Sequence, residues 1–394
     1  MIYLDNNATT RIAPEVAAAM LPYLNTFFGN PSSAHALGRE MKRAVENARQ
    51  EVAELIGAAD ASEVVFTSCG SESDNWAISG ALAAQPEKKH IVTTKVEHEA
   101  VRNLCKRLET QGCEVSWIGV NSEGELDMDA LQQSLREDTA IVSVMLANNE
   151  TGVLFPVNEI GRLVRERTNA LFHVDGVQAV GKIPIDLKSW QVDLFALSGH
   201  KFHAPQGIGA MYIRRGVELP SFMVGGKQED GRRAGTSAVP GIVGLGAACR
   251  LARLEDDHDR ILNLRNSLED SILSQIPNAR LNGPADRTKR LPNTSNISFE
   301  YVEGQNILTH LDEAGICVST GSACHSSSHE SSPTLRAMNV PYTAAQGSIR
   351  FSIGRYNTDA EIHETLNVLP GIIKKLVDMS PYENELKALY AKKG

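Results

Sequence analysis

The sequence predicts an α/β protein with a large, mostly parallel sheet flanked by helices and a second, smaller α+β domain. Between about residues 64 and 213, short apolar runs alternate with amphipathic stretches of helical length, which is typical of strands joined by crossover helices. After Val239 a helix-rich segment precedes further strand-like runs near residues 296, 316 and 349. A chain of 394 residues exceeds the usual size of a single core, so two domains are expected.

The composition excludes several classes of protein. Hydrophobic residues make up 42% and charged residues 22%, as in an ordinary globular protein. The net charge of −9 and the lack of a long basic run argue against a nucleic-acid or anionic-membrane partner. The N-terminus turns polar at Asp5, too early for a signal peptide, and no apolar run could span a bilayer, which predicts a cytoplasmic protein. Its six cysteines are therefore expected to be free thiols.

The periodicity of apolar residues predicts the individual elements. A first long helix runs from Leu37 to Ile56, and Gly57 ends it. Ser71 and Asp74 resemble a capping box that starts a helix over about residues 72–84. The predicted strands of the large sheet are 64–66, 90–94, 115–120, 140–146, 171–174, 194–197 and 210–213.

Polar residues follow two neighbouring strands of this sheet. Asp175 ends one apolar run, and Lys201 follows the next after a Ser-Gly-His turn. Because parallel strands bring their C-terminal ends to one edge, Ser71, His98 and Asn149 are expected beside them. A carboxylate that keeps a pyridinium nitrogen protonated and a lysine that forms a Schiff base are what pyridoxal phosphate requires. A plain surface salt bridge would use the same two residues.

Other residues near this edge suit an anionic, aromatic ligand. Gly70 and Ser71 offer amides and a hydroxyl at a helix N-terminus, and Ser198 and His200 could add donors to the same phosphate. Ser71 could equally serve only as a helix cap. His98 could stack on a cofactor ring or move protons, or it could be a surface histidine between two glutamates.

Cys324 differs from the other cysteines in its surroundings. It lies in the Gly- and Ser-rich stretch 321–333, whose composition is that of an exposed, mobile loop. The other cysteines fall in or beside predicted helices and strands, where thiols are usually inert. Exposure beside His325 is the setting of a reactive thiolate. A metal site of Cys324, His325 and His329 would lack a fourth ligand, so no metal is expected.

Seven motifs, in order along nearly the whole chain, together resemble the cysteine desulfurases of the nitrogen-fixation and iron–sulfur-assembly type. They are YLDNNATT at 3–10, GNPSS at 29–33, FTSCGSE at 66–72, ANNETG at 147–152, SGHK at 198–201, RRAGT at 232–236 and GSAC at 321–324. The resemblance implies fold type I of the pyridoxal-phosphate-dependent enzymes. It also implies a large domain over 15–255 and a small domain formed by 1–14 and 256–394.

The resemblance assigns roles to residues that would bind the cofactor and the substrate. Lys201 would be the Schiff-base lysine, Asp175 would contact the pyridinium nitrogen, and His98 would stack on the ring and shuttle protons. The remaining cofactor contacts would come from Gln178 near the ring hydroxyl, from Gly70, Ser71, Ser198 and His200 at the phosphate, from Thr236 of the partner in a homodimer, and from Asn149. The substrate carboxylate would be held by Arg350 and Asn30, with Asn149 near the substrate.

The implied reaction converts L-cysteine to L-alanine and leaves the sulfur on Cys324 as a persulfide. An iron–sulfur scaffold protein would accept that sulfur, with Cys324 as a possible transient cluster ligand during transfer. Two departures from the family are Ser71, where threonine is usual, and the stretch after Cys324, which lacks the family's apolar residue and puts docking on the acceptor in question.

Two other functions fit parts of this pattern. The chain could be a lyase or transaminase for another amino acid, with Cys324 incidental. It could also be a non-catalytic sulfur-relay scaffold that keeps the fold. The presence of Lys201, Asp175 and Cys324 together weighs against the scaffold.

Overall fold

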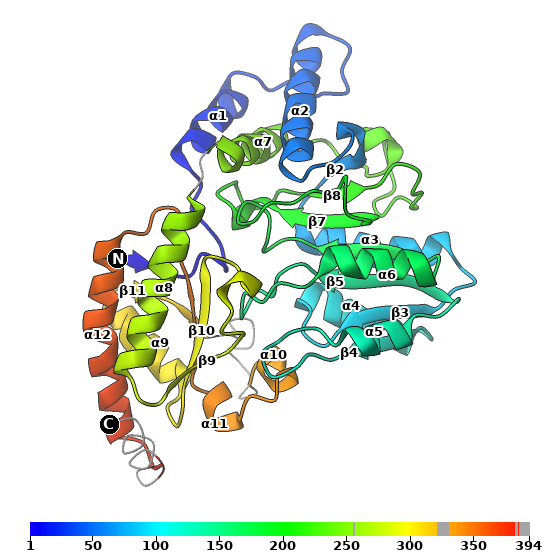
Figure 1. The fold of residues 1–394 in the computed structure, drawn as a ribbon. Helices are drawn as coiled ribbons and strands as arrows, with labels where there is room; N and C mark the ends of the chain where they lie inside the picture. The colour runs from blue at the N-terminus through cyan, green and yellow to red at the C-terminus, as the bar shows by residue number, and fades with distance from the viewer. Residues whose placement is uncertain (255–256, 321–330, 383–384, 386–394) are drawn as a thin grey trace.

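The computed structural model describes residues 1–254, 257–320, 331–382 and 385 (Figure 1). Its largest element is a seven-stranded sheet in the order β2-β8-β7-β6-β5-β3-β4. The strands are β2 Val64–Thr67, β3 His90–Thr94, β4 Glu114–Ile118, β5 Thr139–Met145, β6 Leu171–Asp175, β7 Leu194–Ser198 and β8 Gly209–Ile213. β8 runs antiparallel to both of its neighbours, and the other pairs are parallel. The predicted mostly parallel sheet is therefore confirmed.

Helices cover both faces of this sheet (Figure 1). The crossover helices are α3 Gly70–Ala84, α4 Glu99–Thr110, α5 Met128–Ser134 and α6 Val157–Arg167. Side chains alternate between the faces along each strand, so Val64 and Phe66 join one hydrophobic cluster and Val65 joins the other. Apart from the partly exposed edge strand β4, the strands are buried on both faces, which explains why most of them appear in the sequence as apolar runs.

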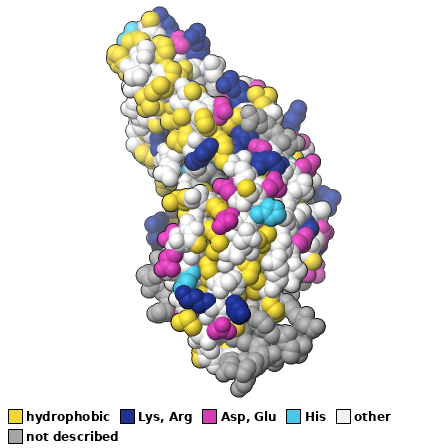
Figure 2. Space-filling view, turned by 90° about the vertical axis from the view of Figure 1, so that its left-hand side faces the viewer, with side chains coloured by type: hydrophobic (Ala, Val, Ile, Leu, Met, Phe, Trp, Pro, Cys, Tyr) yellow, Lys and Arg dark blue, Asp and Glu magenta, His cyan; other side chains and the backbone are white. Residues whose placement is uncertain are grey.

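Three helices pack together at one end of the sheet, at the top of Figure 1. They are α1 Pro14–Asn25, α2 Ala36–Leu55 and α7 Val239–Leu254. The predicted end of α2 is confirmed, because Gly57 has a φ of +63° and a Cβ there would lie 2.8 Å from the Cα of Asp186. Figure 2 shows hydrophobic side chains gathered over this end of the molecule.

A second sheet has the order β12-β13-β10-β9 and is antiparallel throughout. Its strands are β9 Ala279–Leu281, β10 Thr294–Phe299, β12 Ser319–Thr320 and β13 Ser348–Ser352. The accompanying helices are α8 His258–Gln275, α9 Gly304–Glu313, α10 Pro333–Ala337, α11 Tyr342–Ala345 and α12 Asp359–Asp378. The helix α12 begins with a capping box of Thr358 and Glu361.

The N-terminal arm packs with the elements around the second sheet. β1 Ile2–Tyr3 pairs in parallel with β11 Ile316–Cys317, and Leu4 joins a hydrophobic cluster otherwise drawn from residues 264–376. This cluster is separate from the two that cover the large sheet. The separation supports the domain division at residues 14 and 255, which stays a prediction.

The prediction of a capping box at Ser71 is wrong. α3 begins at Gly70 after Cys69, and among the described residues no side chain caps its first turn. Ser71 is inside the helix, and Asp74 is directed into the protein, where it is 1% exposed. The carboxylate of Glu72 instead accepts a hydrogen bond from the amide of Ser68 at 2.7 Å.

The predictions of free cysteines and of a mobile loop at 321–333 can be compared with the structure only in part. Cys69, Cys105, Cys113, Cys249 and Cys317 are free thiols. Cys324 and most of the predicted mobile loop lie outside the described residues, at 321–330. Within the described ranges, no helix is both long enough and apolar enough to cross a membrane.

Candidate active site

A pocket of about 170 Å³ lies at the C-terminal edge of the parallel strands. It is lined by Cys69, Gly70, Ser71, Asp74, His98, Met145, Ala147, Asn149, Asp175, Val177, Gln178, Ser198, His200 and Lys201. The structure thus brings together nine of the thirteen predicted site residues. Drug-sized ligands occupy pockets of about 300–1,000 Å³, so this smaller hollow suits a single small ring compound.

Asp175 and Lys201 face this pocket from adjacent strands. Asp175 ends β6, is only 6% exposed, and accepts a hydrogen bond from the amide of Val177 at 2.9 Å. Burial raises the pKa of Asp175, while His98, the Val177 amide and Lys201 oppose that rise. Lys201 follows β7 in a short 3₁₀ turn, Gly199–Lys201. Since Asp175 is buried in a pocket wall, the alternative of a surface salt bridge is wrong.

His98 is half-buried and lies directly before α4. Its Nδ1 accepts a hydrogen bond from the amide of Ala100 at 3.2 Å, which places the proton of the neutral ring on Nε2. Burial lowers the pKa of His98, so the imidazole is neutral near pH 7. The alternative of a histidine exposed between two glutamates is therefore wrong.

The N-terminus of α3 forms the opposite wall. Gly70 approaches Val177 so closely that a Cβ at residue 70 would lie 2.6 Å from Cγ2 of Val177. Because no side chain of the described residues caps this turn, its amides remain available to an anion. Burial, followed by Lys201 and Lys182, lowers the pKa of His200 to about 4, so this ring is also neutral.

Asn7 is a residue of the site that the sequence did not single out. Its backbone carbonyl accepts from Nζ of Lys201 at 2.7 Å and from Nε2 of Gln178 at 2.9 Å. Its side chain donates to the hydroxyl of Thr294 on β10 at 2.9 Å. The signal that could have indicated it is its place in the motif YLDNNATT at 3–10, where it is the second of two consecutive asparagines.

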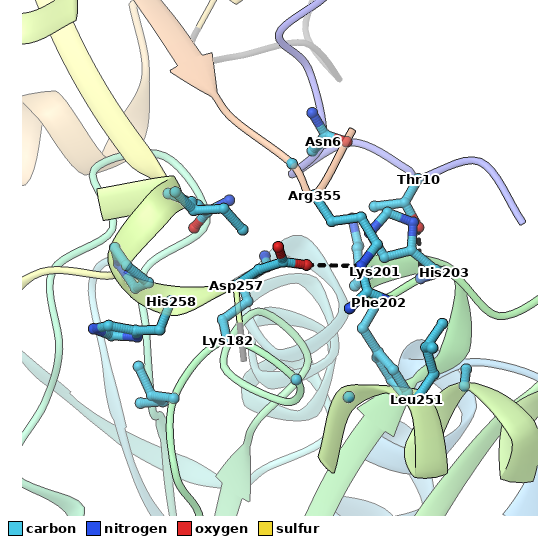
Figure 3. Close-up of a pocket in the computed structure, with 18 of the residues that line it drawn as sticks. Asn6, Thr10, Lys182, Lys201, Phe202, His203, Leu251, Asp257, His258 and Arg355 are labelled. Atoms are coloured by element: carbon cyan, nitrogen blue, oxygen red, sulfur yellow. Dashed lines mark hydrogen bonds and ion pairs between the residues drawn. The ribbon is translucent and has the colours of Figure 1, made fainter. Parts of the chain in front are cut away.

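Lys182 is a second basic residue that the sequence did not indicate. Its Nζ donates to Oε1 of Gln178 at 2.9 Å and to Oδ1 of Asn7 at 3.2 Å. Burial, then Lys201 and Arg350, lower the pKa of Lys182 well below its ordinary value. Lys182 and Lys201 both line a larger cleft of about 720 Å³, which Figure 3 shows together with the Asp257–Arg355 ion pair. Lys201 therefore separates this cleft from the smaller pocket.

Arg350 lies near the pocket but does not line it. It is on β13 and 4% exposed, and its guanidinium donates to the carbonyl of Asn149 and to Oδ1 of Asp5, both at 2.8 Å. Its buried Nε has no hydrogen-bond partner among the described residues. Nε is thus a donor that no described residue uses, and Asp5 is a carboxylate partner that a substrate carboxylate could replace.

Asn30 and Thr236 lie away from the pocket. Asn30 is exposed in the loop between α1 and α2, where its Oδ1 accepts from the amide of Ser32. Thr236 lines a different hollow with Ser68 and Arg233. The structure does not bring either residue to the pocket of its own chain, and their predicted roles stay predictions.

The donors of the pocket fit pyridoxal phosphate. A carboxylate, a neutral imidazole and a lysine face one another, and an uncapped helix N-terminus with two serines offers neutral donors to a phosphate. No group of three or more His, Cys, Asp or Glu side chains in the described ranges could hold a metal ion.

Comparison with known proteins identifies the family over most of the chain. The profile of the family described as "Aminotransferase class-V" matches residues 2–364. The chain belongs to the aminotransferase class-V family.

Two relatives with high sequence identity to this chain are both described as cysteine desulfurases. A "Cysteine desulfurase" of Nostoc sp. is 55% identical over 387 residues, which cover 98% of this chain and 96% of the relative. The "Cysteine desulfurase NifS" of Azotobacter vinelandii is 49% identical over 383 residues, covering 97% and 94%.

Solved structures of this class-V group show the same fold. A structure described as "NIFS-LIKE PROTEIN" has a TM-score of 0.88 and 37% identity, covering 95% of this chain and all of the other. "SspA in complex with cysteine" has a TM-score of 0.80 and 32% identity, covering 91% of this chain and all of the other. The predicted family and fold type are therefore confirmed.

Stability of this class-V chain should depend on pH through Glu97, whose carboxyl is buried behind the pocket. Burial raises its pKa from 4.5 to about 8. Between these values the unfolded chain releases the proton and the folded chain keeps it. The free energy of unfolding should therefore fall with rising pH by up to about 1.4 kcal/mol per pH unit from this group.

Denaturant unfolding of the wild type and of Glu97→Gln at pH 5, 6, 7 and 8 measures this effect. The glutamine variant should lack this part of the slope, and the control Glu40→Gln, at a partly exposed surface site, should keep it. Parallel pH profiles for the wild type and Glu97→Gln would contradict the assignment.

Proposed function

We propose that this chain is a pyridoxal-phosphate-dependent L-cysteine desulfurase, which converts L-cysteine to L-alanine and passes the sulfur to an acceptor for iron–sulfur cluster assembly. The observation that carries the proposal is the convergence of Lys201, Asp175 and His98 on one small pocket. The similarity to cysteine desulfurases over 97–98% of the chain supports the choice of substrate.

The cofactor would lie in the smaller pocket. Asp175 would hold the protonated ring nitrogen, Gln178 would face the ring hydroxyl, and His98 would cover one side of the ring. Lys201 would provide the covalent attachment. The phosphate would be bound by Gly70, Ser71, Ser198 and His200, and Asn149 would contact the cofactor or the substrate.

When bound, pyridoxal phosphate supplies an aldehyde that condenses with amines and a ring that withdraws electrons from the substrate carbon. Because Nδ1 of His98 is engaged by the Ala100 amide, Nε2 is the ring nitrogen through which His98 would exchange protons near the substrate. The backbone carbonyls of Asn7 and Ala8 orient the Lys201 amine.

Cys324 would take the sulfur. Its thiolate attacks the sulfur of the substrate cysteine, so that an S–S bond forms and the C–S bond breaks. The electron pair of the C–S bond stays with the carbon, which takes up a proton and leaves as alanine. The persulfide on Cys324 is then the form of sulfur that an iron–sulfur scaffold protein would accept.

The substrate carboxylate would bind Arg350. Nε of the buried guanidinium has no partner among the residues that the structure describes, and Asp5 holds the guanidinium with a carboxylate in the place that a substrate carboxylate would take. Arg350 presents a planar, bidentate donor set that matches a carboxylate. Asn30 would assist.

The active form would be a homodimer in which Thr236 of the partner completes the phosphate site. Large apolar side chains are exposed near one end of the molecule, with Leu24 63% and Phe28 78% exposed. The exposed segment 222–224 is joined to the loop that carries Thr236, because the amide of Ala234 donates to the carbonyl of Met223. Exposed apolar surface of this kind marks protein contacts. The cytoplasmic location stays a prediction.

Incubation with L-cysteine and a thiol reductant, followed by joint measurement of alanine and sulfide, tests the function. The wild type should produce both in equal amounts. Cys324→Ala should lose sulfide release by at least about 100-fold, because the sulfur has lost its nucleophile. The matched control Cys317→Ala should retain activity. Full sulfide release by Cys324→Ala would remove that residue from the mechanism.

Replacement of Lys201 tests the cofactor site. Purified wild type should be yellow, and Lys201→Ala should lack the wild type's visible absorption band, because the covalent attachment is gone. Absorption spectra after addition of pyridoxal phosphate measure this. Lys182→Ala is the neighbouring control and should keep a visible band. The same band in Lys201→Ala would show that another residue holds the cofactor.

Arg350→Lys should raise the KM for L-cysteine by about 10-fold or more, because the point charge of lysine cannot replace two parallel hydrogen bonds. Steady-state kinetics measure the change, with Arg336→Lys on α10 as the control. An unchanged KM would place the substrate carboxylate elsewhere.

Light scattering should give a mass of twice 42.8 kDa for the wild type. Phe28→Asp should weaken the dimer and release the cofactor, because it places a charge in the apolar contact. Met379→Asp, which changes an exposed residue just past the end of α12, should leave the dimer intact. A monomer with full activity would contradict the proposal.

A further inference from the structure

Three buried polar atoms beneath the pocket have no hydrogen-bond partner among the described residues. They are Oδ1 of Asp74, Oε2 of Glu97 and Nε2 of His173. Buried polar atoms nearly always have a partner, so a group of three beside one site needs an explanation.

His173 and Asp74 face each other in this group. His173 is two residues before Asp175 on β6, so both side chains lie on the same face of the sheet. Nδ1 of His173 is 2.9 Å from Oγ of Ser143 on the neighbouring strand β5. Its Nε2 is 3.5 Å from Oδ1 of Asp74, which reaches down from α3. A proton on Asp74 would give both atoms the partner that they lack.

Three carboxyl groups lie close together here. Burial raises the pKa of Asp74 well above its ordinary value, and Asp175, then Glu97, then Cys69 raise it further. Burial likewise raises the pKa of Glu97 to about 8. Neighbouring carboxylates in a buried site cannot all be ionised, so the charge must settle on one of them.

Asp175 is the carboxyl best supplied with groups that stabilise an anion. The Val177 amide donates to it, and His98 and Lys201 favour its charged form. Glu97 receives two donors on Oε1, from the Thr94 hydroxyl at 2.8 Å and the Met145 amide at 3.0 Å, whereas no described residue donates to Oε2. That asymmetry is typical of a carboxylic acid with its proton on the second oxygen.

His173 does not offer Asp74 a positive charge. Its burial lowers the pKa of the imidazole to about 3, so the ring is neutral at physiological pH. The charged or titratable groups that face Asp74 are then Asp175 from β6, Glu97 from the segment after β3 and Cys69 from the turn before α3. Each of them disfavours an anion at Asp74.

We propose that Asp74 is a neutral carboxylic acid whose hydroxyl donates to Nε2 of a neutral His173, and that this pair, with a neutral Glu97, keeps Asp175 as the single anionic carboxyl beneath the cofactor. The inference rests on the proposed function, because Asp175 needs to be anionic only if a pyridinium ring lies against it. Asp74 and His173 are positioning residues in this scheme. A negative charge on Asp74 would raise the pKa of the neighbouring Asp175. Asp175 would then take up a proton and lose the charge with which it has to hold the ring nitrogen.

Infrared spectroscopy of the full-length chain without added cofactor detects protonated carboxylic acids directly. The wild type should show the carbonyl bands of two buried acids at pH 7. Asp74→Asn should remove one and Glu97→Gln the other, and the Glu97 band should disappear as the pH rises through about 8. An undiminished acid band in Asp74→Asn would overturn the proposal.

Nitrogen NMR of histidine-labelled wild type tests the pair without a variant of Asp74. The signal that is absent in His173→Gln should belong to a neutral ring protonated on Nδ1, unchanged between pH 6 and 8. An imidazolium signal would overturn the proposal even if Asp74→Asn failed to fold.

The holoprotein, loaded with ring-¹⁵N-labelled pyridoxal phosphate, tests the consequence. The ring nitrogen should give the shift of the protonated form in the wild type and in Asp74→Asn, since one neutral side chain replaces another. Asp175→Asn should lose that shift. A deprotonated ring in Asp74→Asn would overturn the inference, whereas a protonated ring in Asp175→Asn would refute the proposed role of Asp175 and leave the infrared result standing.

Discussion

The hydrogen bonds of Asn7 tie the two sheets to the candidate active site. The backbone carbonyl of Asn7 holds Lys201 and Gln178, which come from the large sheet. Its side chain holds Thr294 and Asn293, at the start of a strand of the second sheet. The arm that follows β1 therefore fixes the lysine relative to both halves of the molecule. A shift of this arm would therefore change the direction of the Lys201 amine, although Asn7 itself does not line the pocket.

Electrostatics divide the site into two layers. The upper layer, around Lys201, Lys182 and Arg350, is positive, and burial makes a further positive charge costly there. The lower layer, around Asp74, Glu97 and Asp175, would be negative if all of its carboxyls were ionised. Desolvation limits the number of charges in each layer, and hydrogen bonds select which group carries them. Neutral His98 and His200 lie on the walls of the pocket, where they can donate or accept without adding charge.

Lys201 lines both the smaller pocket and the larger cleft, so its side chain is accessible from two sides (Figure 3). Lys182 and Lys201 both line the larger cleft, and Phe202 and Leu251 form part of its apolar wall. An amine that is reached from two sides can be held by the backbone carbonyls of Asn7 and Ala8 on one side while a ligand approaches from the other. The second sheet contributes Ile353 and Arg355 to this cleft, so its size depends on how the two sheets meet.

The sequence by itself determined the alternation of strands and helices, the mostly parallel sheet and the meeting of Asp175, Lys201, His98 and Ser71 at one edge. These follow from local patterns, because apolar runs form buried strands and parallel strands end at a common edge. Only the tertiary structure decided the roles of Asn7 and Lys182, whose partners are more than 100 residues away or on the far side of a turn. It also decided that Asp74 faces inward rather than capping α3, since that depends on His173 lying beneath the helix. Charges at buried groups cannot be read from residue types, because burial and neighbours, which are set by packing, determine each pKa.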